Sequence, residues 1–121
     1  MAKILVVEDD ILTKKAIGYL LRGEGYEVYE AEGGLHALSL LAENQFDLVV
    51  SDIVMPRIDG FDLLEHASST SPPTPVLLMT AYSPMQSQVK TRGAAEFILK
   101  PFLLDDLLSK IEQVLNQKSN T

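Results

Sequence analysis

The sequence predicts an α/β domain built on a doubly wound parallel sheet of five strands. Short apolar runs alternate with helical patterns five times along the 121 residues. Runs of this length that are apolar almost throughout are typical of parallel strands buried on both faces. Most of the runs also end in a charged or hydroxylated residue. That pattern is expected where the carboxyl ends of parallel strands form a functional edge.

The expected strands follow the apolar runs in chain order. They cover residues 4–7, 27–31, 48–51, 76–79 and 97–99. The second strand is short and partly polar, which favours a place near the edge of the sheet. The expected helices cover about 12–22, 35–43, 61–67 and 104–114, and Asp10 is placed to cap the first of them. Turn-forming residues separate these elements, most clearly at Pro56, Asp59, Gly60 and in the proline-rich stretch 68–75.

The composition indicates a single globular domain over residues 1–121, ending in a polar tail or linker start at about 117–121. The absence of cysteine excludes disulfides and thiolate metal sites. A net charge of -7 argues against direct binding of nucleic acid. No apolar run is long enough to span a bilayer, and the first residues lack the pattern of a signal peptide. We therefore expect a cytoplasmic protein that has no membrane partner.

Acidic residues follow two of the expected strands. The first strand runs into Glu8 and Asp9, and the third runs into Asp52. A flavodoxin-like strand order of 2-1-3-4-5 makes these two strands neighbours, so the three carboxylates converge. Converging carboxylates repel one another unless a cation neutralises them. The pattern therefore predicts a site for Mg²⁺, or Mn²⁺, with the backbone carbonyl of Val54 as a further oxygen ligand.

Phosphoryl transfer is the chemistry that these strand ends predict. Asp52 is the candidate nucleophile, because a carboxylate can attack phosphorus and form an aspartyl phosphate. Lys100, at the end of the fifth strand, offers a positive charge to the phosphoryl oxygens, and the hydroxyl of Thr80 can hydrogen-bond one of them. Positioning and charge neutralisation are the main requirements of such a transfer.

Together these residues resemble the receiver domain of bacterial two-component response regulators. The resemblance spans nearly the whole chain and is carried by four motifs: LVVED at 5–9, SDIVMP with DG at 51–60, TA at 80–81 and KPF at 100–102. It implies that a sensor histidine kinase or a histidine phosphotransfer protein donates the phosphoryl group to Asp52, and that the protein slowly hydrolyses it. It also implies a downstream target or output domain, which the sequence does not identify.

The resemblance further implies a conformational switch. Thr80 would move toward the phosphoryl group, and Phe97 would turn inward into the space that Thr80 leaves. The surface of the fourth helix, the fifth strand and the last helix would then change. The resemblance also implies a cis peptide bond between Lys100 and Pro101.

The chain departs from the family pattern between Thr80 and Lys100, which are closer in sequence than is usual. The shortening falls in residues 83–92, where Pro84 also restricts the backbone. We therefore expect a short or poorly ordered fourth helix and an atypical output face. Val54 and Tyr82 are bulky at positions that control access of water in the family, which predicts a long-lived phosphate.

Three other functions compete with the phosphorylated switch. A receiver-like docking module that works without phosphorylation stays open because of the altered stretch 83–92, although Asp52, Thr80 and Lys100 are all present. An aspartate-dependent phosphatase would need a second acid at the position of Val54. A flavin or nucleotide carrier would need a glycine-rich loop after the first strand, which is missing. The sequence is compatible with a monomer or a weak dimer.

Overall fold

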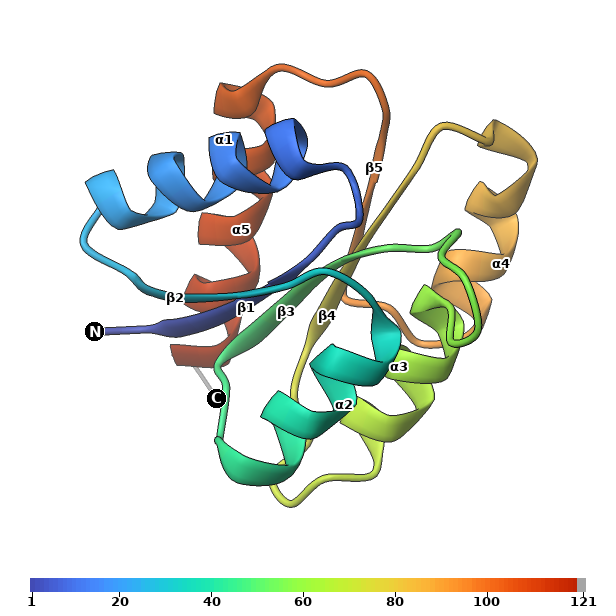
Figure 1. Ribbon diagram of the computed structural model, residues 1–121, viewed down its shortest axis with the longest axis horizontal. Coiled ribbons are helices and arrows are strands. Elements are labelled where there is room, and N and C mark those ends of the chain that lie inside the picture. The colour runs from blue at the N-terminus through green and yellow to red at the C-terminus, as the bar shows by residue number, and fades with distance from the viewer. Residues whose placement is uncertain (120–121) are drawn as a thin grey trace.

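Five parallel strands form the centre of the protein in the order β2-β1-β3-β4-β5, which confirms the predicted order. The structure is a computed structural model that describes residues 1–119 (Figure 1). The strands are β1 (Lys3–Val7), β2 (Glu27–Ala31), β3 (Leu48–Asp52), β4 (Val76–Thr80) and β5 (Glu96–Leu99). Each differs from its expected bounds by no more than one residue at either end.

Helices cover both faces of the sheet (Figure 1). One face carries α1 (Ile11–Gly23) and α5 (Leu104–Ser119), and the other carries α2 (Gly34–Glu43), α3 (Gly60–Ser68) and α4 (Gln86–Thr91). Alternate residues of β1 point to opposite faces of the sheet. Leu5 and Val7 lie in the core under α2 and α3, whereas Ile4 and Val6 lie in the core under α1 and α5. Every residue of β3 and β4 is buried, which explains why both strands are apolar almost throughout.

Side-chain caps fix the starts of two helices. Asp10 caps α1 and accepts a hydrogen bond from the backbone N–H of Thr13 at 2.9 Å. Asp59 caps α3 and accepts from the N–H of Asp62 at 2.9 Å, while the Asp62 carboxylate accepts from the N–H of Asp59. The first of these caps is the one that the sequence predicts.

The last helix is longer than predicted. Its buried residues Leu107, Ile111 and Val114 account for the expected end near residue 114, but the helix continues to Ser119. The helix therefore includes residues 117–119 of the predicted polar tail or linker start, and residues 120–121 lie outside the described part of the chain. None of the helices within residues 1–119 is both long enough and apolar enough to cross a membrane.

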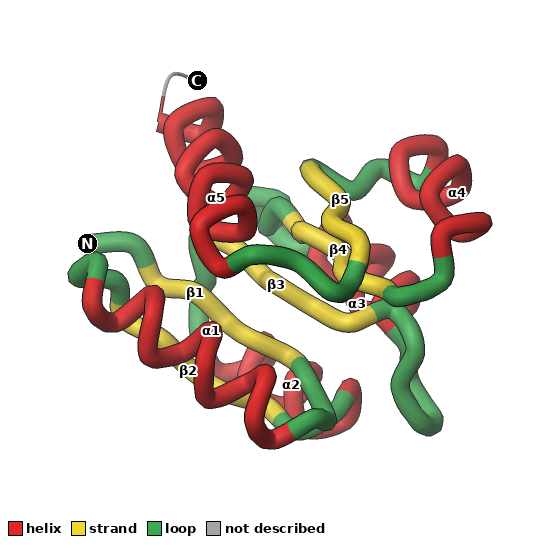
Figure 2. The backbone as a smooth tube through the Cα atoms, turned by 90° about the horizontal axis from the view of Figure 1, so that it is seen from above, coloured by secondary structure: helices red, strands yellow, loops and turns green. Residues whose placement is uncertain are grey.

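The fourth helix is short, as predicted. A 3-10 turn at Ser83–Met85, which contains Pro84, leads into the six residues of α4. Proline fits the first turn of a helix because its missing N–H would have no partner there. In two perpendicular views α4 stands at the edge of the molecule, beyond β4 and β5 and away from α1 (Figure 2).

Candidate functional site

The predicted site residues lie at the carboxyl ends of four strands. Glu8 follows β1, Asp52 ends β3, Thr80 ends β4 and Lys100 follows β5. Lys100 brings the two acids together: its Nζ lies 3.0 Å from Asp52 Oδ2 and also donates a hydrogen bond to Glu8 Oε1. The ladder between β4 and β5 fixes this lysine, because the backbone N–H of Lys100 donates to the carbonyl of Thr80 at 2.8 Å.

Three carboxylates converge beside this lysine. One oxygen each from Glu8, Asp9 and Asp52 lies within 4.8 Å of the other two. Glu8 is fully buried and Asp52 is 8% exposed, whereas Asp9 is open to solvent. Within residues 1–119, Oε2 of Glu8 is buried and lacks a hydrogen-bond partner. An unpaired buried carboxylate oxygen is costly, and a divalent cation with oxygen ligands would satisfy it. The residues present therefore fit Mg²⁺ or Mn²⁺.

Burial and charge act in opposite directions on the two ends of the Glu8–Lys100 pair. Burial raises the pKa of Glu8 above its usual 4.5, and the neighbouring Asp52 raises it further, while Lys100 only partly opposes this. Burial by itself would lower the pKa of Lys100. The hydrogen bonds to Glu8 and Asp52 outweigh that effect, so the pKa of Lys100 is raised above 10.5. Lys100 is therefore a permanent positive charge in the site.

Thr80 and Phe97 are both buried, and within residues 1–119 no hydrogen bond or ion pair joins either side chain to the three acids. The Oγ1 of Thr80 accepts a hydrogen bond from the N–H of Tyr82 at 3.2 Å. Phe97 is 6% exposed and lies in the core together with Leu78 and Val89. Unlike these buried residues, Tyr82 is 59% exposed.

Val54 and the peptide bond between Lys100 and Pro101 complete the placement of the predicted site residues. Val54 lies in this loop and is 61% exposed. The peptide bond between Lys100 and Pro101 is cis, and so is the bond between Ser71 and Pro72. Arg57, in the same loop as Val54, has a φ of 70°, which is uncommon for a residue other than glycine.

The contact between Gly60 and the backbone of Asp52 is not evident from the sequence. The N–H of Gly60 donates to the carbonyl of Ile53 at 2.8 Å. A Cβ at this position would lie 2.5 Å from the carbonyl oxygen of Asp52 and 2.8 Å from the Cα of Ile53. The first turn of α3 therefore lies directly on the candidate nucleophile's backbone. The only signal in the sequence is a glycine at a helix start, which also has the simpler reading of a loop.

Comparisons with known proteins agree with this geometry. The family model of the response regulator receiver domain matches residues 4–112. The response regulator MprA of Mycobacterium sp. (strain KMS) is 36% identical over 119 residues, which make up 97% of this chain and 52% of MprA. The chain therefore spans about half the length of this curated relative.

Solved structures show the same fold over nearly the whole chain. A CheY-like receiver domain protein of Methanospirillum hungatei JF-1 has a TM-score of 0.92 and 30% identity, covering 99% of this chain and 98% of that one. TrrA of Thermotoga maritima, solved in complex with Mg²⁺ and BeF, has a TM-score of 0.85 and 33% identity, covering 94% and 99%. With a matching family model, matching relatives and an acidic pocket at the expected strand ends, the chain belongs to the CheY-like receiver domains of two-component response regulators.

Proposed function

We propose that this receiver is a switch that accepts a phosphoryl group on Asp52 from a phosphohistidine of a sensor histidine kinase or a histidine phosphotransfer protein. The observation that carries the proposal is the position of Lys100, whose Nζ lies 3.0 Å from Asp52 Oδ2 beside the three clustered carboxylates. A cation next to a nearly buried carboxylate is what a bound phosphoryl group would need for charge neutralisation.

The transfer itself needs little from the protein beyond positioning. A carboxylate oxygen of Asp52 attacks phosphorus and forms a P–O bond as the P–N bond to the donor histidine breaks. The electron pair of the broken bond leaves with the imidazole nitrogen. Lys100 stabilises the negative charge on the phosphoryl oxygens. A bound Mg²⁺ or Mn²⁺ would add charge neutralisation and orientation, held by Glu8, Asp9, Asp52 and the backbone carbonyl of Val54.

The conformational response is proposed to begin at Thr80. The Oγ1 of Thr80 now accepts a hydrogen bond from the N–H of Tyr82 at 3.2 Å. To hydrogen-bond the phosphoryl group, it would have to break this hydrogen bond. Phe97 is already buried, with 6% of its surface exposed, so it does not need to rotate from solvent into the core. We therefore propose that Thr80 acts on the segment after β4, while Phe97 adjusts within the core and the surface of α4, β5 and α5 changes.

A groove beside the site is proposed to receive the phosphodonor protein. It has a volume of about 410 Å³ and lies between α1 and the segment after β5. Ile17, Pro101 and Phe102 give it an apolar lining, and Lys100 lines it as well. Exposed Ile11 and Leu12 lie at the start of the same helix. A partner seated here would have its phosphohistidine next to Lys100.

The wider setting follows from the family. Receiver domains interact with histidine kinases and are typically cytoplasmic, and homologues of this chain carry output domains. We propose the same location for this protein, with an output domain or a separate target downstream. We also propose that Val54 and Tyr82 shield the phosphate and lengthen its lifetime. Loss of the phosphate within seconds of removing the donor would contradict that part of the proposal.

Acetyl phosphate tests the central step. After incubation with Mg²⁺ and acetyl phosphate, intact mass spectrometry should show a single phosphoryl adduct that base treatment removes. Asp52→Asn should abolish the adduct, whereas Asp59→Asn, which changes the acid that caps α3, should keep it. An adduct that survives in Asp52→Asn would refute the assignment. A wild-type protein that forms no adduct would favour the alternative, a docking module that works without phosphorylation, to which the short α4 points.

A further inference from the structure

Few apolar contacts attach α4 to the rest of the protein. Within residues 83–92, Val89 is the single buried side chain and Met85 is partly buried, while the others are exposed. A helix of six residues is too short to be stable without tertiary contacts. Contacts other than apolar burial must therefore help to hold α4 in place.

Arg92 makes such a contact where α4 ends. Its guanidinium carbon lies 4.1 Å from the centroid of the Phe61 ring. Its backbone N–H donates to the carbonyl of Gln88 at 3.0 Å, so the residue is also the cap of the helix. A guanidinium over an aromatic face is attractive, and its planar shape lets it stack as well.

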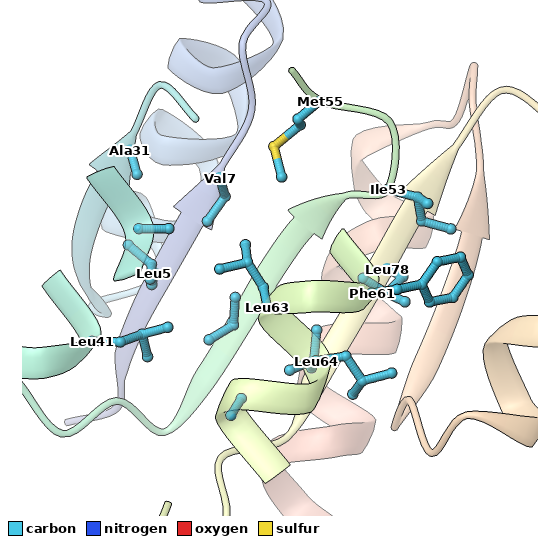
Figure 3. Packing of buried hydrophobic residues seen from close by; sticks show 14 of the residues in the cluster. Leu5, Val7, Ala31, Leu41, Ile53, Met55, Phe61, Leu63, Leu64 and Leu78 are labelled. Carbon is cyan, nitrogen blue, oxygen red and sulfur yellow. The ribbon is translucent and has the colours of Figure 1, made fainter. Parts of the chain in front are cut away.

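Phe61 is a rigid base for this contact. It is 5% exposed and lies in the same core as Leu78 and Val89, and Figure 3 shows its ring close to Leu78. It is the second residue of α3, directly after Gly60. Gly60 packs closely on the Asp52 backbone, since an added Cβ would lie 2.5 Å from the Asp52 carbonyl oxygen, and its N–H donates to the carbonyl of Ile53 at 2.8 Å. A displacement of the Asp52 backbone would therefore be passed on to Phe61.

We propose that Arg92 is a positioning residue that fastens α4 to the first turn of α3 and thereby makes α4 respond to changes at Asp52. The fastening is a property of the unmodified protein. The response to Asp52 rests on the proposed function. The two parts are tested separately, so that failure of one is distinguishable from failure of the other.

Amide hydrogen exchange in the unmodified protein tests the fastening. The N–H groups of Gly93 and Ala94 donate to the carbonyls of Lys90 and Val89, so they report opening of the last turn of α4. In Arg92→Ala, both should exchange about two- to fivefold faster after correction for intrinsic rates, as expected for loss of a partly exposed cation–π contact. Lys90→Ala removes an equal charge from the same helix and should leave both rates near those of the wild type.

Equal rates in the Arg92→Ala and Lys90→Ala proteins would overturn the proposal. A double-mutant cycle with Phe61→Leu identifies the partner, because leucine keeps an apolar side chain but removes the ring. In the Phe61→Leu background, Arg92→Ala should cause no further acceleration. An undiminished acceleration there would also overturn the proposal. Arg92→Lys, which keeps the charge but not the planar group, should fall between Arg92→Ala and the wild type.

NMR with Mg²⁺ and beryllofluoride, a phosphoryl analogue, tests the response to Asp52. In the wild type, amide signals of Thr80 and of α4 should both shift. In Arg92→Ala, the shift at Thr80 should persist and that of α4 should become much smaller, because only the route through Thr80 and the segment after β4 remains. A full response of α4 in this variant would overturn the coupling. If no wild-type signal shifts, the proposed function fails and the coupling fails with it, while the exchange rates alone decide the fastening.

Discussion

Replacing Gly60 by alanine should destabilise the protein, because the first turn of α3 leaves no room for a methyl group. The new Cβ would lie 2.5 Å from the oxygen of Asp52, 2.8 Å from the Cα of Ile53 and 3.0 Å from Leu78 Cδ2. Two of these atoms belong to the backbone, so relief requires a shift of α3 away from β3. Overpacking of this kind costs about 1–3 kcal/mol, and the rigid neighbours place the expected loss near 2 kcal/mol. The melting temperature should fall by about 6–10 °C.

Gly23→Ala is the matched control. A Cβ there meets no atom within 4 Å, and Gly23 lies in the last turn of α1 without a positive φ. Alanine favours helix over glycine, so this variant should gain up to about 1 kcal/mol. Urea unfolding and thermal melting of both variants and the wild type, all without Mg²⁺, measure the two effects. Stability of Gly60→Ala equal to that of the wild type would refute the close contact between α3 and the Asp52 backbone.

Three further predictions concern the site and the loop beside it. Mg²⁺ at about 100 times its dissociation constant should stabilise the wild type by about 2.7 kcal/mol, which thermal melting records as a rise in melting temperature. Asp9→Asn should lose most of this rise, and an equal rise in both proteins would contradict the metal site. Arg57→Gly should raise the free energy of unfolding in urea by up to about 1 kcal/mol, because glycine adopts the left-handed backbone at this position without strain. A lower free energy of unfolding would show that contacts of the Arg57 side chain outweigh this strain. Because the folded pKa of Glu8 is raised above 4.5, the stability that Glu8 contributes is present below pH 4.5 and lost as pH rises through the folded pKa. In EDTA, the difference in unfolding free energy between Glu8→Gln and the wild type should therefore grow in favour of Glu8→Gln as pH rises from 4.5, and a constant difference would contradict the raised pKa.

The fold is largely predictable from the sequence because strands buried on both faces are apolar along their whole length. The run Leu48–Ser51 shows this most clearly, and every residue of β3 is buried. The end of α5 is less predictable, because apolar spacing reports which residues are buried and not where the helix stops. The apolar spacing ends at Val114 and Leu115, while the polar residues 116–119 continue the helix.

The convergence of Glu8, Asp9 and Asp52 follows from strand order alone, so the sequence predicts it. The hydrogen bonds of Lys100 Nζ to both Glu8 and Asp52 depend on how the three side chains are oriented, so only the structure shows them. The constraint at Gly60 is hidden for a different reason: a glycine marks a turn as often as it marks a close approach of two backbones.

The short segment between Thr80 and Lys100 does not disturb the arrangement of the strand ends. The sheet fixes the position of Lys100, whereas α4 lies outside the sheet. Thr80 pairs with Leu99 in the ladder between β4 and β5, and this register places Lys100 next to the acids whatever the length of the connecting segment. The connecting segment contains α4, which has six residues, lies outside the sheet and buries only Val89. The chemistry of the strand ends and the shape of the α4 surface can therefore vary independently. We therefore expect a small phosphodonor to react at Asp52 whatever the shape of α4, and we expect a protein that binds α4 to depend on that short helix.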